Sequence, residues 1–193
     1  MAAMIKLKTL LTEMPIHKKV YGQIGATDRI IMSAEPTITP RDTMQPIKAA
    51  WKPRGLWYAI GTEWIDWTRD NMPEWETDYA HRAHVDESRI LRLGHDMTIQ
   101  EFEHLFGAEH ETIETAPVCL AIHWWKVKAY KGAKYAGIEV VHPWGGIGSW
   151  LRTWDISSGC IWNPAAIKSI DMITLTKTPA TTDGIDTPND PRM

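Results

Sequence analysis

The stretch W-D-I-S-S-G-C-I-W-N-P, residues 154–164, places an aspartate, two serines and a glycine between two tryptophans, beside an apolar run typical of a buried strand. Its carboxylate, Asp155, has two interpretations. In one, Asp155 and the serines form a turn whose main-chain amides the carboxylate binds. In the other, the tryptophans exclude water around a carboxylate that stabilises a developing positive charge. By itself the stretch favours the turn.

The composition predicts that the chain forms one folded domain with a short appendage. Of 193 residues, 44% are hydrophobic and 23% are charged, which is ordinary globular usage. The net charge of −3 predicts no general attraction for nucleic acid or an anionic membrane, although a local basic groove for nucleic acid is compatible with it. No apolar run reaches the ~18 residues that span a bilayer, and the N-terminus lacks the apolar stretch of a signal peptide, so we expect no membrane association and a cytoplasmic protein.

Aromatic and sulfur residues predict a well-filled core. There are 11 tryptophans against two phenylalanines, and core filling is the expected role of most of them. Trp64, Trp67 and Trp75 recur at helical spacing, which predicts a stripe that a helix buries. Cys119 and Cys160 lie in apolar surroundings and are expected to be reduced, buried thiols.

Local patterns predict mixed short helices and strands, and therefore an α+β domain. The first half is expected to contain a helix within 2–14 and strands at 29–34 and 56–60. A helix capped by Thr62 and stopped by Pro73 is expected next, followed by two strand-like pieces within 79–93 that D-E-S separates. Behind the capping box T-I-Q-E we expect a helix with Phe102, Leu105 and Phe106 buried. The second half is expected to contain an apolar run at 118–122, a basic amphipathic segment from Trp124, a strand at 136–141, a glycine-rich loop at 142–150 and a closing strand.

Three regions follow from these patterns: an N-terminal helical extension at 1–27, the folded domain at 28–175, and a polar, proline-rich tail at 176–193 that is expected to be mobile.

Metal and serine-nucleophile chemistry find little support. His81 and His84 are three apart, and Cys119 and His123 share a face if they lie on a strand, but no second pair at ligand spacing accompanies either, so no metal site is expected. The serine motif G-x-S-x-G is absent. The glycine-rich 144–149 lacks the G-K-[ST] of a phosphate-binding loop and is expected to be a flexible loop over a site.

One succession of short motifs resembles a known family. G-L-W-Y-A (55–59), V-D-E-S-R-I-L (85–91), Y-A-G-I-E-V (135–140) and C-I-W-N-P-A-A-I-K-S-I (160–170) follow one another as the motifs of ADP-ribosyltransferase-like domains do in bacterial toxins and phage-encoded proteins. The similarity spans about residues 28–173.

The resemblance implies a fold and a reaction. The expected fold is a V-shaped, split α+β sandwich of two small sheets with flanking helices, which binds NAD between the sheets. The implied activity is transfer of ADP-ribose from NAD to a host macromolecule, with a host protein as the expected target, located in the host cytoplasm if the protein is phage-encoded.

The resemblance also assigns roles to residues of this chain. Asp155 matches the catalytic acid best, and Glu139 in the strand A-G-I-E-V is the alternative. Trp57 and Tyr58 form the aromatic strand of the family, and alternation turns one of them to the cleft and the other to the core.

Further candidates for binding NAD lie beside these residues. Trp154 would contribute to an aromatic wall, whereas Lys52 and Arg54 would meet the pyrophosphate or simply form a solvated basic turn.

The chain departs from the family in its first strand, where Met32 occupies the usual arginine or histidine position. Arg29 lies three residues earlier and is expected on the opposite face, ~10 Å away. The alternative hypothesis is therefore a catalytically inactive module of the same fold, which docks on a host or virion protein through the cleft or an exposed tryptophan patch.

Overall fold

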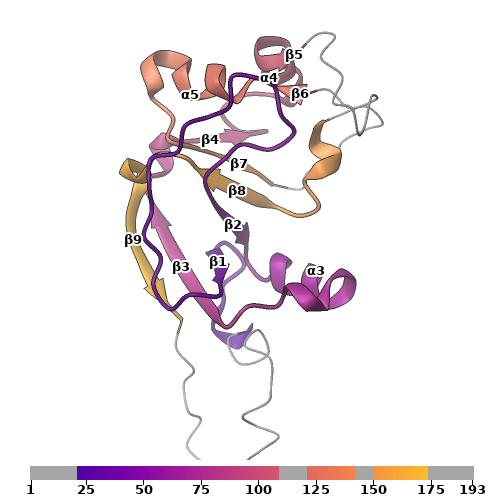
Figure 1. Ribbon diagram of the computed structural model, residues 1–193, viewed down its shortest axis with the longest axis vertical. Helices are drawn as coiled ribbons and strands as arrows, with labels where there is room; N and C mark the ends of the chain where they lie inside the picture. The colour runs from indigo at the N-terminus through magenta and orange to yellow at the C-terminus, as the bar shows by residue number, and fades with distance from the viewer. Residues whose placement is uncertain (1–20, 109–120, 142–149, 174–193) are drawn as a thin grey trace, which may run out of the picture.

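The computed structural model describes residues 21–108, 121–141 and 150–173, and it confirms the α+β class. Seven strands form one curled sheet in the order β4-β7-β8-β2-β1-β3-β9, and β5 and β6 form a separate two-stranded ladder (Figure 1). The strands are β1 (Arg29–Ser33), β2 (Leu56–Ile60), β3 (Tyr79–Val85), β4 (Ile90–Leu93), β5 (Gly107–Ala108), β6 (Ala121–Ile122), β7 (Gly137–Val140), β8 (Ser158–Ile161) and β9 (Ile167–Met172).

The sheet has two halves that β2 connects. On one side β2 pairs with β8, which continues to β7 and β4, and on the other it pairs with β1, which continues to β3 and β9. Neighbouring strands are antiparallel except for β4 and β7. The resemblance implied two small sheets, but the described strands of both halves belong to one continuous sheet.

The two strands expected within 79–93 are confirmed, and they lie far apart in the sheet. A short 3-10 turn, η3 (Glu87–Arg89), separates them, and the Asp86 side chain accepts a hydrogen bond from the amide of Ser88. β3 pairs with β1 and β9, whereas β4 pairs with β7 at the opposite edge. The D-E-S turn thus carries the chain from one half of the sheet to the other.

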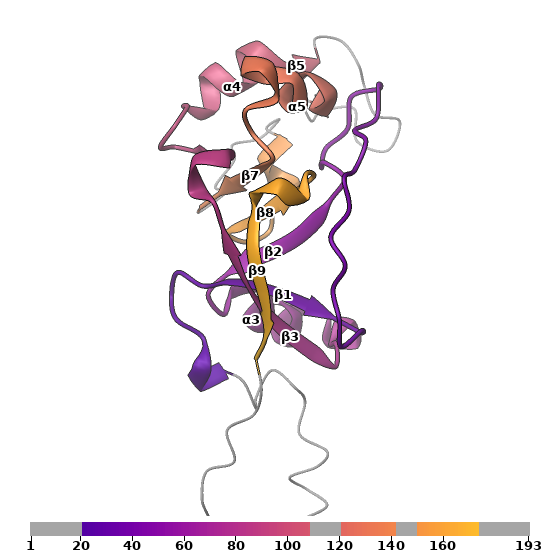
Figure 2. The same ribbon diagram turned by 90° about the vertical axis from the view of Figure 1, so that its left-hand side faces the viewer.

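The helices lie at opposite ends of the molecule (Figures 1 and 2). α4 (Ile99–Phe106) and α5 (Trp124–Ala133) pack together beyond the β4-β7-β8 half, and α3 (Glu63–Asn71) lies beside β1 and β2. None of the helices in the described ranges combines the length and apolar character that crossing a bilayer needs.

Two groups of tryptophans differ in their surroundings. Trp124, Trp150 and Trp162 are fully buried in the core between the sheet and α4 and α5, as expected of core filling. The expectation was wrong for the stripe of α3, whose buried residues are Ile65 and Thr68. Its tryptophans pack instead on one another and on the 3-10 turn η2 (Pro73–Trp75), with ring centroids 5.4 to 6.3 Å apart.

The capping box at the start of α4 is confirmed. The Thr98 hydroxyl accepts from the amide of Glu101, and the Glu101 carboxylate accepts from the amide of Thr98. Phe102 and Phe106 are buried as expected, but Leu105 is 46% exposed. Thr62 precedes α3 without capping it, because its hydroxyl donates to Asp66 at 2.9 Å.

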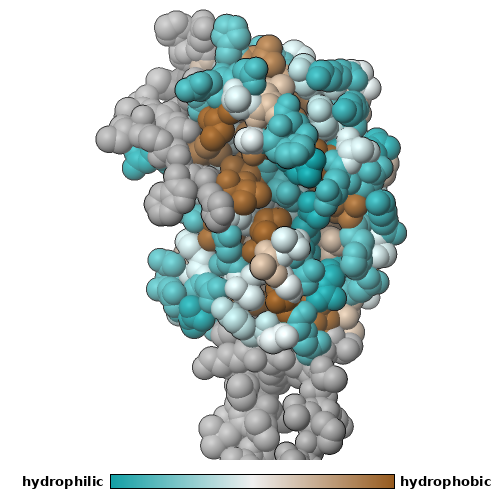
Figure 3. Space-filling view, turned by 180° about the vertical axis from the view of Figure 1, so that it is seen from behind, coloured by the Kyte–Doolittle hydropathy of each residue, from teal (hydrophilic) through white to brown (hydrophobic). Residues whose placement is uncertain are grey.

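Seen from behind, the molecule is mainly hydrophilic, with its hydrophobic residues gathered along the middle (Figure 3).

Several expectations lie outside the described residues: the helix within 2–14, the loop 142–149, the tail 176–193 and Cys119. Cys160 is a buried free thiol, and burial raises its pKa.

Candidate functional site

Strand β2 separates two candidate sites because its neighbouring side chains point to opposite faces of the sheet. Trp57 lies on the face that carries α4 and α5, where it packs against Trp154 with ring centroids 5.0 Å apart. Tyr58 is 2% exposed on the other face, where its hydroxyl donates to Glu139. The predicted division of this pair between the two faces is therefore confirmed.

On the Trp57 face lies a cavity of about 590 Å³, which we call the tryptophan pocket. Its aromatic walls come from four segments: Trp57 of β2, Trp64 of α3, Trp75 of η2, and Trp154, which precedes β8. Ile30 and Met32 of β1 also line it. The pocket has the size of a small-molecule site and is lined mainly by aromatic and apolar groups, as such sites are.

Four charged side chains line this pocket: those of Asp155, Glu74, Glu76 and Lys52. Asp155 and Lys52 both line it, with their side chains about half exposed, and Oδ2 of Asp155 is 4.0 Å from Nζ of Lys52. The Lys52 ammonium also lies 5.5 Å from the centre of the Trp57 ring, at cation–π distance. Burial lowers the pKa of Lys52, and the charge of Asp155 opposes that shift.

The turn around Asp155 is held by other groups than its carboxylate. The amide of Ser157 donates to the Glu63 carboxylate of α3, and the Ser157 carbonyl accepts from the amide of Ile60. Within the described part of the chain, Asp155 accepts no main-chain hydrogen bond and its polar partner is Lys52. The geometry therefore does not show the carboxylate bound by its own turn, and at 46% exposure it is not shielded from water either.

Two lining residues carry buried polar atoms that lack a partner. Nε1 of Trp154 and Oγ1 of Thr77 are buried and form no hydrogen bond with any residue of the described ranges. Trp154 as a whole is 2% exposed. Such groups are rare in folded proteins.

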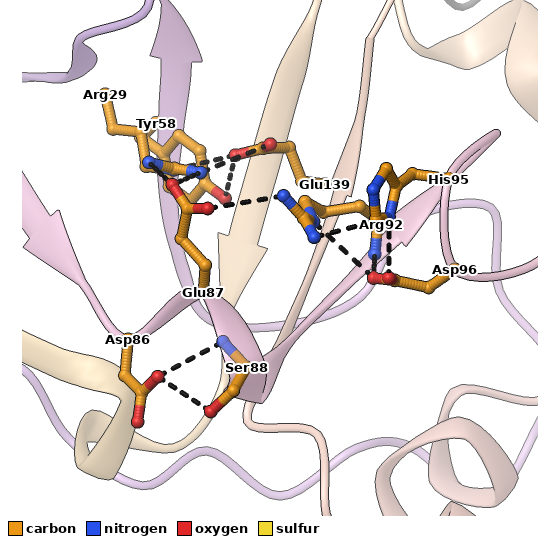
Figure 4. A network of polar contacts seen from close by, with 9 residues as sticks. All are labelled: Arg29, Tyr58, Asp86, Glu87, Ser88, Arg92, His95, Asp96 and Glu139. Carbon is orange, nitrogen blue, oxygen red and sulfur yellow. Dashed lines mark hydrogen bonds and ion pairs between the residues drawn. The ribbon is translucent and has the colours of Figure 1, made fainter.

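Glu139, the alternative catalytic acid, lies on the opposite face of the sheet in a network of charged groups (Figure 4). Its carboxylate accepts from Nε of Arg29 at 2.7 Å and from the Tyr58 hydroxyl at 2.9 Å. Arg29 also bonds Glu87, which in turn pairs with Arg92. Glu139 does not line the tryptophan pocket, so the two carboxylates do not meet in one site.

Burial and charge act together in this network. Burial, followed by the negative charge of Glu139, raises the pKa of Tyr58 well above its ordinary value. Burial acts to lower the pKa of Arg29, but the hydrogen bond and charge of Glu139 outweigh it and the pKa is raised. The Arg29 and Glu139 side chains are only 14% and 6% exposed and join β1, β2 and β7. Together with Glu87 they line a second cavity, of about 380 Å³, on this face.

The glycine of the quoted stretch makes this network possible. Gly159 of β8 lies between Tyr58 on β2 and Glu139 on β7 in the register of the sheet. A Cβ at this position would collide with Cζ and Oη of Tyr58. The absence of a side chain therefore lets the phenol cross over β8 to reach Glu139.

Of the remaining predicted residues, some line the tryptophan pocket and others do not. Met32 lines the tryptophan pocket, and Arg29 belongs to the opposite face, as expected. Arg54 was predicted to bind the cofactor, but it does not line the pocket; its main-chain amide and carbonyl are held by Gln45. The basic residue of this turn that does line the pocket is Lys52.

Sequence reasoning missed Trp64, Trp75 and Thr77 as lining residues. Helical spacing predicted a buried stripe for the two tryptophans, but Trp75 is 49% exposed. For Trp75 a signal was present in the sequence: a glutamate lies on either side of it, in E-W-E, and carboxylates rarely enter a core.

Among the described residues, no group of three or more histidine, cysteine, aspartate or glutamate side chains could hold a metal ion. No family model, curated protein or solved structure matches the chain.

Proposed function

We propose that the protein is an NAD-dependent mono-ADP-ribosyltransferase that binds the nicotinamide end of NAD in the tryptophan pocket. The observation that carries the proposal is Asp155. Its carboxylate lines an aromatic cavity beside Lys52 and is not engaged by its own turn. The resemblance of residues 28–173 to ADP-ribosyltransferase-like domains supports the same assignment.

The aromatic walls suit the positively charged pyridinium ring of NAD. Indole rings attract a cation that lies over their face, and the attraction strengthens when water is excluded. Trp57, Trp64, Trp75 and Trp154 all line the one cavity.

Asp155 supplies the charge that the reaction needs. As the bond between C1′ of the ribose and the pyridinium nitrogen breaks, the bonding electrons go to nicotinamide, which leaves neutral, and the positive charge moves to the sugar. A carboxylate held beside the sugar stabilises this cation. A nucleophile of the target then forms the new bond to C1′ and loses its proton.

Lys52 is the cation of the pocket lining. In the position where the related domains carry an arginine or histidine, this chain has Met32, whose side chain can neither donate a hydrogen bond nor carry charge. We assign the contact with the anionic part of NAD to Lys52.

Met32 also supports a second candidate function. Without the arginine or histidine that this position usually carries, the protein would be a catalytically inactive module of the same fold that docks on a host or virion protein. The two functions share the pocket and differ in the role of Asp155.

Release of nicotinamide and transfer of label from NAD to host lysate test both candidates. The transferase requires transfer by the wild type, loss of transfer in Asp155→Asn, and retained NAD binding measured by tryptophan fluorescence. Asp171→Asn is the matched control, since Asp171 is an exposed aspartate of β9 paired with His84.

The outcomes separate the candidates. Binding of NAD without nicotinamide release would favour the module, and equal transfer by Asp155→Asn and the wild type would remove the role of Asp155. Absence of NAD binding would exclude the transferase and leave the docking module as the candidate.

A further inference from the structure

The rim of the tryptophan pocket is an acidic and aromatic segment. Residues 63–78, which we call the acidic rim, contain six acidic residues and three tryptophans against one basic residue, Arg69. The whole chain carries a net charge of only −3, so this one segment, with a formal charge of −5, concentrates negative charge at the mouth of the pocket. Trp64, Trp75 and Glu74 belong both to the rim and to the pocket lining.

The charges of the rim are only partly neutralised within the molecule. Arg69 pairs with Asp66 and Asp70, and Glu63 accepts from the amide of Ser157. Glu74 and Asp78 are exposed and form no ion pair with a residue of the described ranges. The carboxylates of Glu74 and Asp78 are therefore presented to solvent.

The tryptophans of the rim form a platform beside these carboxylates. Trp64 and Trp67 stack with an interplanar angle of 17°, and Trp75 lies within 6.3 Å of both ring centroids and is 49% exposed. Indole faces and carboxylates together are the groups that bind guanidinium and ammonium ions, the first by cation–π attraction and the second by charge-assisted hydrogen bonds. Trp64 and Trp75 of this platform also line the tryptophan pocket.

We infer that the acidic rim docks a basic segment of a protein, rich in lysine or arginine, at the mouth of the tryptophan pocket. In the transferase proposed above, on which this reading of the partner's role rests, that protein is the acceptor of ADP-ribose. A nucleic acid is disfavoured as the partner because its phosphates would meet the charge of the rim with like sign.

Binding of labelled peptides to the full chain, measured by fluorescence anisotropy in the absence of NAD, tests the inference. Fluorescein-labelled oligo-arginine and oligo-lysine peptides are the probes, and an oligo-glutamate peptide of equal length and a single-stranded DNA are the comparisons. The basic peptides are expected to bind, with an affinity that falls as salt is added, and the two anionic probes are expected not to bind.

Two pairs of variants locate the binding surface. Trp75→Ala and Glu74→Lys are each expected to weaken binding of the basic peptides roughly fivefold or more. Trp125→Ala, which removes a 43% exposed tryptophan of α5, and Glu35→Lys, which reverses an exposed charge after β1, are the matched controls and are expected to change it little.

The inference is overturned if the basic peptides do not bind, if the DNA binds more tightly, or if the rim variants and their controls have equal effects. Because NAD is absent, this result does not depend on the labelling experiment. If the protein binds basic peptides but releases no nicotinamide, the docking role of the acidic rim is supported and the transferase is contradicted. If it releases nicotinamide but does not bind basic peptides, the transferase is supported and the docking role is contradicted.

Discussion

Gly159 shows how one residue can determine the contacts of a whole face. It is the point at which Tyr58 crosses from β2 toward Glu139 on β7, and a Cβ would collide with the phenol and lie 2.7 Å from the carbonyl of Ile138. No flexible side-chain end is available to move aside, because Tyr58 is 2% exposed. The residue type is therefore required by packing alone.

Gly159→Ala is expected to lower the free energy of unfolding by about 2 kcal/mol or more, because overpacking displaces the buried ring. Urea denaturation followed by circular dichroism measures this change. Gly22→Ala is the matched control, since a Cβ at Gly22 meets no atom within 4 Å. A variant as stable as the control would show that the ring does not need this space.

Tyr58 makes stability depend on alkaline pH. Its pKa is raised by burial and by Glu139, so the folded protein keeps the phenol neutral while the unfolded chain ionises it above about pH 10. The stability contributed by Tyr58 is therefore fully present below pH 10 and declines as pH rises beyond it, by up to about 1.4 kcal/mol per pH unit.

Tyr58→Phe removes this dependence, and it also lowers stability at neutral pH by about 1–3 kcal/mol because Glu139 loses a donor. The free energy of unfolding of both proteins, measured from pH 8 to 11, checks the difference in slope. Parallel curves would contradict the predicted burial of an un-ionised phenol.

At the scale of single elements, the two helix starts differ in what their threonines do. Thr98 binds the amide of Glu101 and completes a capping box, whereas Thr62 binds the side chain of Asp66 and leaves the first amides of α3 without a side-chain cap. The sequences differ in the same sense, because Glu101 stands at the third helical position after Thr98, whereas Ile65 stands there after Thr62.

Thr98→Ala is expected to lower the free energy of unfolding by about 1 kcal/mol, the usual contribution of such a cap. Thr62→Ala is the comparison and is expected to have the smaller effect. Equal losses in urea denaturation would mean that the Thr62 hydroxyl contributes as much through Asp66 as Thr98 does through the backbone.

For the whole molecule, the arrangement of the strands predicts cooperative unfolding. β2 lies between the halves of the sheet, and the D-E-S turn connects β3 in one half to β4 in the other. Arg29, Tyr58 and Glu139 also join β1, β2 and β7 from within. Neither half can therefore unfold without disturbing the other.

Tryptophan fluorescence and far-ultraviolet circular dichroism are expected to report one coincident transition. Arg29→Met leaves Glu139 buried with an uncompensated charge and should lower the free energy of unfolding by about 3–5 kcal/mol without separating the two signals. Arg69→Met, which removes an exposed arginine, is the control and should change it little. Separate midpoints would contradict a single cooperative unit.

Much of the local structure could be predicted from the sequence. The strand Leu56–Ile60, the strand that starts at Arg29 and the capping box of α4 follow from alternation, flanking glycines and a short polar signature, which act over a few residues. The candidate site could be predicted in part: Trp57, Trp154, Asp155 and Lys52 line one cavity, while Arg54 and Glu139 do not. Helical spacing misplaced Trp64 and Trp75, because periodicity marks a shared face but not what covers it.

By itself, the sequence determined which segments extend or coil and which side chains of β2 face apart, since these depend on backbone geometry and neighbours in the chain. Only the tertiary structure decided that β3 and β4 occupy opposite halves of the sheet. It also decided that Arg29 and Glu139, 110 residues apart, meet beneath Tyr58, and that four tryptophans from separate segments enclose one pocket. The physical reason is that such contacts depend on which distant surfaces can bury each other, and no local pattern encodes that choice.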